Sequence, residues 1–231
     1  MSTSAASGKM QRLKLQTTSH RFAFLLCSQF ALIVISPFVG SAGRRPGPVF
    51  SVFAMTLFLT ALNLVIEKRR LRGVAILLCA AAVVTGLLNA LGFERAFLIP
   101  GIICAMVFIA FTTGMILWKI ISATKVTRET LYGAVSAYLF VGITFGMAYA
   151  LVELLAPGSI RLTVETGRPL AWQDFTFFSF ITLTTIGYGD VVPIGGVKAL
   201  VMLEAVIGAM YPPILIGRLL TLYPSRDGTN S

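Results

Sequence analysis

Long apolar runs separated by short polar segments make up most of the chain. Five runs of about 20 residues carry no charged side chain, and a sixth run near the C-terminus carries one carboxyl, with one arginine close to its end. A helix of that length and composition crosses the hydrocarbon core of a bilayer. The pattern therefore predicts an all-α membrane protein with six transmembrane helices, at residues 22–42, 47–66, 73–93, 96–118, 130–152 and 199–220.

One further apolar segment, 173–184, is too short to span a membrane. Its 12 residues would form a helix of about 18 Å, which can enter the bilayer and leave again on the same side. Helix-breaking proline and glycine residues before it predict an exposed connector at 156–171. We therefore expect a re-entrant pore helix, and Asp174 in its first turn suits the positive end of the helix dipole.

Composition agrees with a membrane protein and excludes an ordinary soluble domain. The 231 residues are 56% hydrophobic and 12% charged. A net charge of +10 is also typical of nucleic-acid-binding proteins, but those cluster basic residues on one soluble face. Here the basic residues lie between apolar runs, where they indicate topology, so we expect no nucleic acid partner.

The distribution of Lys and Arg predicts the orientation of the six helices. With both termini in the cytoplasm, thirteen of the 19 basic residues lie on the cytoplasmic side, as the positive-inside rule requires. These are Lys9, Arg12, Lys14, Arg21, Lys68, Arg69, Arg70, Arg72, Lys119, Lys125, Arg128, Arg218 and Arg226. The prediction is a multi-pass protein of the plasma membrane or bacterial inner membrane. The first run could instead be a signal peptide, although it exceeds the usual core of about 7 to 15 residues.

Four segments follow from this topology. We expect a disordered cytoplasmic tail at 1–20, a peripheral domain of four helices at 21–125, a pore domain at 126–223 and a short cytoplasmic tail at 224–231. The fourth run, 96–118, has no internal Lys or Arg, whereas a voltage sensor needs several charges within the membrane. Steep voltage gating and a cytoplasmic regulatory domain are therefore not expected.

The cysteines and the histidine offer no chemistry of their own. Cys27, Cys79 and Cys104 each lie inside an apolar run, where a thiol behaves as a small hydrophobe, and His20 stands alone before the first run. We expect no disulfide, no metal site built from cysteine or histidine, no cofactor and no enzymatic activity.

The stretch Thr184-Thr185-Ile186-Gly187-Tyr188-Gly189-Asp190 carries the candidate chemistry. Its two glycines allow backbone dihedrals that other residues avoid, so that successive carbonyls can point toward one axis and replace the water around a cation. Gly-Tyr-Gly-Asp alone is ordinary turn chemistry. Its position, after a re-entrant segment and before a spanning helix, favours the ion-coordinating interpretation.

This motif resembles the selectivity filter of potassium channels, and residues 132–223 resemble the two-helix pore module of that superfamily. The resemblance implies K⁺ sites formed by the Thr185 hydroxyl and by the carbonyls of Thr185, Ile186, Gly187 and Tyr188, with Gly189 completing the filter. Ile186 stands where valine is commoner. Because one filter strand cannot surround an ion, we expect a homotetramer in a lipid bilayer.

The predicted function is passive, K⁺-selective conduction, with K⁺ as the permeant ion. Three alternatives stay open: a weakly selective cation channel, a non-conducting or heteromeric channel subunit, and the membrane subunit of a K⁺ uptake transporter. The last kind resembles four linked pore units in one chain, and this chain has one.

Residues around the filter are expected to support it: Thr182, Thr184, Asp190 and Glu204. Phe177 and Phe178 replace a tryptophan pair of well-studied members and offer no N–H donor. Thr182 is the expected partner of Tyr188, and Asp190 has no candidate partner. A lone carboxyl in a membrane helix is costly, so Glu204 should brace the pore helix through Ser179 or Thr182; the alternative is that it reaches water at the outer interface.

The last helix is expected to bend near its middle. Pro212 and Pro213 remove the helix hydrogen bonds to the carbonyls of Gly208 and Ala209. We therefore predict a gate hinge formed by Gly208, Pro212 and Pro213.

Overall fold

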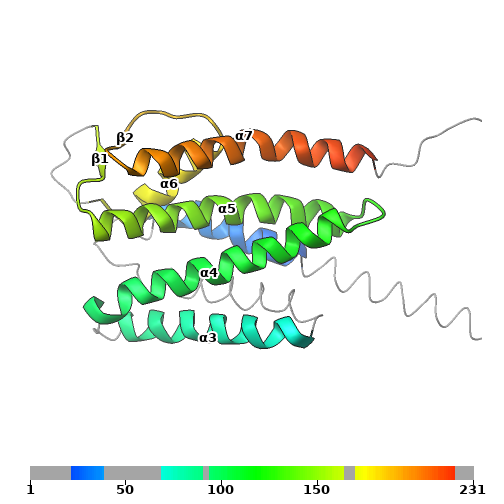
Figure 1. The fold of residues 1–231 in the computed structure, drawn as a ribbon, viewed down its shortest axis with the longest axis horizontal. Coiled ribbons are helices and arrows are strands. Elements are labelled where there is room, and N and C mark those ends of the chain that lie inside the picture. The colour runs from blue at the N-terminus through cyan, green and yellow to red at the C-terminus, as the bar shows by residue number, and fades with distance from the viewer. Residues whose placement is uncertain (1–21, 39–68, 91–93, 164–169, 222–231) are drawn as a thin grey trace, which may run out of the picture.

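The computed structural model describes residues 22–38, 69–90, 94–163 and 170–221, and these residues form helices with one small sheet (Figure 1). The elements are an N-terminal helix at Phe22–Phe38, α3 (Arg69–Ala90), α4 (Glu94–Ile121), α5 (Arg128–Leu155), β1 (Ile160–Leu162), α6 (Trp172–Leu183), β2 (Val191–Pro193) and α7 (Val197–Thr221). The predicted helix at 47–66 and the predicted tails at 1–20 and 224–231 lie outside the described residues.

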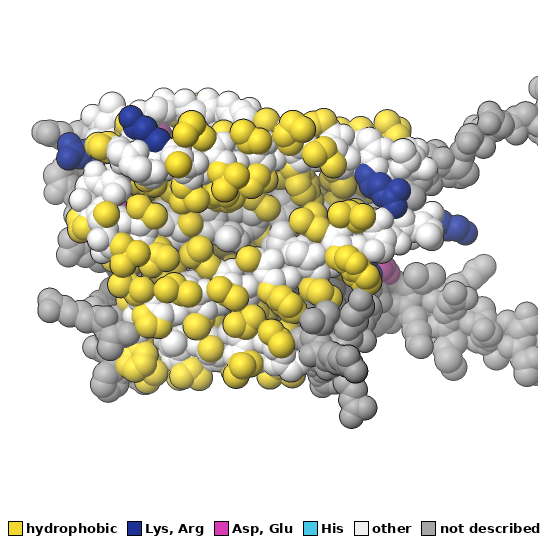
Figure 2. Space-filling model, viewed as in Figure 1, with side chains coloured by type: hydrophobic (Ala, Val, Ile, Leu, Met, Phe, Trp, Pro, Cys, Tyr) yellow, Lys and Arg dark blue, Asp and Glu magenta, His cyan; other side chains and the backbone are white. Residues whose placement is uncertain are grey.

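Three of the described helices are long and apolar enough to cross a membrane. They are Phe97–Ile121, Arg128–Leu155 and Val197–Thr221. Phe22–Phe38 and Gly73–Leu88 are apolar but shorter. Apolar side chains cover the sides of the helices, and Lys and Arg gather at their two ends (Figure 2). The chain is therefore a helical membrane protein, and the total of six spanning helices stays a prediction.

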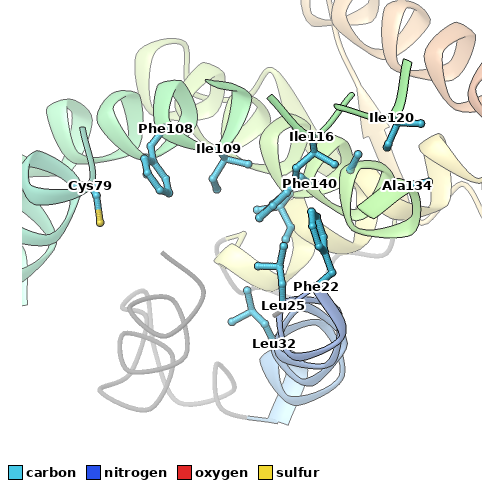
Figure 3. Packing of buried hydrophobic residues seen from close by; sticks show 14 residues of the cluster. Phe22, Leu25, Leu32, Cys79, Phe108, Ile109, Ile116, Ile120, Ala134 and Phe140 are labelled. Atoms are coloured by element: carbon cyan, nitrogen blue, oxygen red, sulfur yellow. The ribbon is translucent and has the colours of Figure 1, made fainter. Parts of the chain in front are cut away.

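The helices lie roughly side by side, with α5 in the middle (Figure 1). On one side of α5 lie α4 and then α3, and on the other side lies α7, with the short α6 next to both. The N-terminal helix packs against α5 through Phe22, Leu25 and Leu32, which share a buried apolar cluster with Ile116 and Phe140 (Figure 3). The N-terminal helix therefore contacts both α4 and α5.

A buried polar contact fixes the N-terminal helix against α5. Gln29 is fully buried, and its Nε2 donates a hydrogen bond to the carbonyl of Ser136 at 3.1 Å. Between two membrane helices such a bond defines how each helix is rotated about its axis. Gln29 thus fixes the orientation of the N-terminal helix within an otherwise apolar contact with α5.

Two glycines on α5 allow α6 to approach closely. A Cβ on Gly142 would lie 2.8 Å from the ring of Phe180, and a Cβ on Gly146 would lie 3.1 Å from the Cα of Thr176. Small residues four apart are a common packing face of membrane helices. The Gly142-x-x-x-Gly146 face therefore seats α6 on α5.

The C-terminal end of α7 is bound to the connector between α4 and α5, residues 122–127. Arg218 Nη2 donates hydrogen bonds to the carbonyl of Ile121 at 2.7 Å and to that of Ala123 at 3.0 Å. The last carbonyls of a helix have no partner within the helix, and a cation suits the negative end of the helix dipole. Arg218 therefore caps α4 from the last turn of α7.

At the opposite end, β1 and β2 form an antiparallel pair. Ile160 is opposite Pro193, and Leu162 is opposite Val191. The expectation of an exposed, irregular connector at 156–171 is wrong at β1, where Ile160 is 1% exposed. The buried residues around this pair are Tyr149, Ala150, Phe175, Phe178, Ile181 and Val197.

Candidate functional site

The short helix α6 leads into the filter motif. At its start, the Asp174 carboxylate accepts a hydrogen bond from the backbone N–H of Ala171 at 2.7 Å, which satisfies one of the free donors of a helix N-terminus. At its end, the backbone N–H and the hydroxyl of Thr184 both donate to the carbonyl of Phe180, at 3.0 and 2.6 Å. The expected pore helix at 173–184 agrees with the observed Trp172–Leu183 within one residue.

Backbone handedness alternates along the motif. The φ angles of Thr185, Gly187 and Gly189 are +60°, +55° and +78°, whereas Ile186 and Tyr188 between them have no positive φ. A positive φ is strained for a β-branched residue such as threonine, and strain of this kind concentrates at functional sites. Alternation of handedness allows successive carbonyls to point to the same side.

Hydrogen bonds hold the N–H side of the filter and leave its carbonyls free. The N–H groups of Ile186 and Gly187 donate to the carbonyl of Ile181 at 2.9 and 3.1 Å, and the N–H of Thr185 donates to Thr182 at 2.9 Å. Within the described residues, no hydrogen bond reaches the carbonyls of Thr185, Ile186, Gly187 and Tyr188. These are the four carbonyls that the sequence predicts as K⁺ ligands.

Tyr188 is held by an aromatic contact. Its ring lies parallel to that of Phe177, with the ring centroids 6.3 Å apart, a distance at which offset aromatic pairs attract. In the described part of one chain, Tyr188 forms no hydrogen bond with Thr182. Phe177 therefore offers Tyr188 a ring contact and no hydrogen bond.

Asp190 is held through its backbone. Its carbonyl accepts a hydrogen bond from the N–H of Thr163 at 2.8 Å. No hydrogen bond of the Asp190 carboxylate occurs among the described residues, and the side chain is exposed. The partner of Asp190 therefore comes from the outer connector, which the sequence interpretation did not consider.

Glu204 is fully buried between α7, α6 and α5. Its Oε1 is 2.5 Å from the hydroxyl of Ser179, and its Oε2 accepts a hydrogen bond from the hydroxyl of Tyr149 at 2.5 Å. Ser179 also lies 2.6 Å from the carbonyl of Gly142. Glu204 thus meets Ser179, one of its two expected partners, and its 0% exposure contradicts the alternative that it reaches water. Tyr149 was not foreseen.

The predicted hinge residues occupy different environments. A Cβ on Gly208 would lie 2.0 Å from the carbonyl oxygen of Leu183, so that α7 touches the last residue of α6 at this glycine. The same oxygen accepts a hydrogen bond from Tyr138 at 3.0 Å. Pro212 and Pro213 are exposed and lie inside α7, which is helical from Val197 to Thr221. The hinge itself stays a prediction.

Comparison with known proteins supports the interpretation of this region. Residues 137–223 match a protein family described as ion channel. Protein LctB of Bacillus caldotenax is 28% identical over 130 residues, which cover 54% of this chain and 93% of LctB. The inward rectifier potassium channel Kirbac3.1 of Paramagnetospirillum magnetotacticum is 40% identical over 74 residues, which cover 32% of this chain and 22% of that protein. Residues 137–223 are therefore similar to an ion-channel domain.

No solved structure matches the chain significantly. The geometry of the site therefore rests on the contacts given above.

Proposed function

We propose that the protein is a K⁺-selective channel that conducts K⁺ passively through a homotetrameric pore. Each subunit contributes one filter strand, Thr185–Gly189, and four symmetric copies give the rings of oxygen that replace the hydration shell of the ion. The setting is a plasma membrane or bacterial inner membrane, with both termini in the cytoplasm and six spanning helices per subunit.

The unpaired carbonyls of the filter carry this proposal. In a single chain these residues are exposed, with Ile186 at 57% and Tyr188 at 71%, and four copies around one axis would confine their carbonyls. A confined backbone carbonyl needs a partner, because an unpaired polar group is costly. A row of four carbonyls without a donor, in a strand whose Thr185, Ile186 and Gly187 N–H groups are satisfied by α6, is ready to accept a cation instead. The alternating φ signs from Thr185 to Gly189 give the row its common direction.

The exposed surface of α7 supports the tetramer. Only 11% of its most apolar stretch is buried within one chain, and Met202, Val206, Met210 and Ile214 are each more than half exposed. A large unpartnered apolar face typically marks a protein or membrane contact. Four copies around one axis would cover part of this face and line the conduction path with the rest.

Purified wild-type protein in liposomes tests the function. In an outward K⁺ gradient we expect K⁺ flux, and in opposed K⁺ and Na⁺ gradients the reversal potential should follow K⁺. Comparable Na⁺ and K⁺ permeability would instead support the weakly selective cation channel. Absence of flux from an intact tetramer would support the non-conducting or heteromeric subunit.

Gly187→Ala should reduce selectivity for K⁺ over Na⁺ without disrupting assembly. Gly187 has φ +55°, and an L-residue with a Cβ pays roughly 1 to 2 kcal/mol there. Nothing lies within 4 Å of the added Cβ in one chain, so the strain acts on the filter backbone. Reversal potentials measure the change, with Gly114→Ala in open space on α4 as the matched control. Unchanged selectivity in Gly187→Ala would contradict the filter assignment.

Replacing both Pro212 and Pro213 with alanine should alter open probability and leave ion selectivity unchanged. The substitutions restore two N–H donors to the carbonyls of Gly208 and Ala209, which stiffens α7 below the filter. Both prolines are exposed within one chain, so little packing is lost. Single-channel recordings measure the change, and gating like that of the wild type would exclude the hinge.

A further inference from the structure

One residue of the outer connector binds two consecutive carbonyls at the outer end of the filter. The Thr163 hydroxyl donates to the carbonyl of Gly189 at 2.6 Å, and the Thr163 N–H donates to the carbonyl of Asp190 at 2.8 Å. The first distance is that of a strong O–H···O hydrogen bond. Gly189 is the filter residue whose carbonyl is not among the four predicted K⁺ ligands.

Thr163 is placed there by the β1–β2 pair. Its N–H continues the ladder beyond Leu162, and at the other end the N–H of Ile194 donates to the carbonyl of Ser159 at 2.7 Å. Ile160 and Val191, one from each strand, are 1% and 4% exposed. β1, which is followed directly by Thr163, is therefore anchored by burial as well as by hydrogen bonds.

A carboxylate on α5 fixes the start of this strand. Glu153 Oε1 accepts from the N–H of Gly158 at 2.8 Å, and Oε2 accepts from the N–H of Ile160 at 2.9 Å. Hydrogen bonds from backbone donors to a carboxylate are stronger than neutral ones. A continuous set of contacts thus runs from the last turn of α5 through Glu153 and β1 to Thr163 and the filter.

We propose that Thr163 is a positioning residue for ion selectivity, because its hydroxyl holds the Gly189 carbonyl in one orientation. This inference rests on the proposed function. Gly189 has φ +78°, and no atom lies within 4 Å of the position that a Cβ would occupy. Nothing packed against Gly189 therefore prevents its backbone from rotating. The preceding peptide, which carries the Tyr188 carbonyl, meets this one at the Gly189 Cα. If the Gly189 carbonyl is released, both peptides can rotate about that glycine, and the Tyr188 carbonyl is then free to turn away from the ion.

The other groups at this end offer no equivalent hold. Within the described residues of one chain, the Asp190 carboxylate forms no hydrogen bond, and Tyr188 is held by ring contact with Phe177. The hydroxyl of Thr163 therefore supplies a hydrogen bond at an end of the filter where the neighbouring Phe177 has no N–H to donate.

Thr163→Val, Thr163→Ala and Thr163→Ser test the inference. Thr163 is exposed, and valine keeps its shape while removing the hydroxyl. The first readout is the K⁺ concentration that gives half-maximal protection of the purified tetramer against heat. It should rise roughly fivefold in the Val and Ala variants, the factor that corresponds to about 1 kcal/mol. The second readout is the reversal potential, which should show weaker preference for K⁺ over Na⁺, while the Ser variant matches the wild type.

Two results would overturn the inference. One is that the Val and Ala variants match the wild type in both readouts, and the other is that Ser is as impaired as Val, since the hydroxyl would then not be the group that matters. Wild-type protein that passes no K⁺ in liposomes would instead refute the proposed function. The two failures are therefore distinguishable.

Discussion

Gly208→Ala should prevent α7 from seating against α6 and abolish K⁺ flux. The added Cβ would lie 2.0 Å from the oxygen, 2.7 Å from the carbonyl carbon and 2.9 Å from the Cα of Leu183. All three are main-chain atoms, which cannot rotate away as a side chain can, so the two helices must separate. We expect a loss of stability at or above the roughly 1 to 3 kcal/mol typical of overpacking.

Gly217→Ala is the matched control for this prediction. It makes the same change in the same helix, but nothing lies within 4 Å of its Cβ. Because alanine favours the helix over glycine by about 1 kcal/mol, this variant should be as stable as the wild type or slightly more stable. Tetramer content on size exclusion, melting temperature and liposome flux measure both variants. Wild-type flux and melting in Gly208→Ala would show that α7 does not touch Leu183 as described.

Glu204→Leu should separate α5, α6 and α7 at the level of the pore helix. The substitution removes both carboxylate oxygens, so the hydroxyl of Tyr149, a fully buried residue, loses its partner and Ser179 loses one of two. A buried hydroxyl without a partner costs about 1 to 3 kcal/mol. We expect a melting temperature well below that of the wild type and loss of flux.

Glu204→Gln should retain most of the stability that leucine loses. Ser179 has one hydroxyl hydrogen but lies within 2.6 Å of both the Gly142 carbonyl and Glu204 Oε1. If that hydrogen goes to Gly142, the group at position 204 must donate to Ser179, which the amide N–H₂ of glutamine can do. Its amide oxygen can accept from Tyr149. A Gln variant as damaged as the Leu variant would show that the negative charge is required.

Tyr149→Phe tests one arm of this contact alone. It removes the hydroxyl that binds Oε2 and keeps the ring, which packs against Phe178 with centroids 4.9 Å apart. The melting temperature should fall between those of the wild type and Glu204→Leu. A value equal to that of the wild type would assign the stabilisation to Ser179.

The helices and the filter could be predicted because their signals are local. Apolar runs of sufficient length identify spanning helices, and the observed bounds of α4, α5 and α7 lie within about three residues of the predicted ones. The filter motif contains its own glycines, and both have the positive φ that the motif requires. The buried glutamate was identified because a lone carboxyl in an apolar helix must find a partner.

The contacts around the filter could not be predicted, because they join residues that are far apart in the sequence and belong to no recognisable motif. Strands of three residues show no periodicity, so the pairing of Ile160 with Pro193 left no pattern to detect. Tyr149 is one hydroxyl among many on apolar helices, and nothing local assigns it to Glu204. Gly142-x-x-x-Gly146 did carry a signal, since small residues four apart are typical of helix contacts, but it does not name the partner helix.

The bond between Arg218 and the connector limits how α7 can move. Gly208 fixes one point of the helix against Leu183, and Arg218 fixes another against Ile121 and Ala123. The segment 209–217, which contains both prolines, therefore lies between two fixed contacts. Bending within that segment leaves both contacts intact, whereas displacement of its C-terminal end either breaks two hydrogen bonds or moves the connector with it. In the second case, α4 and the end of α7 move together, while the contact of Gly208 with Leu183 stays in place.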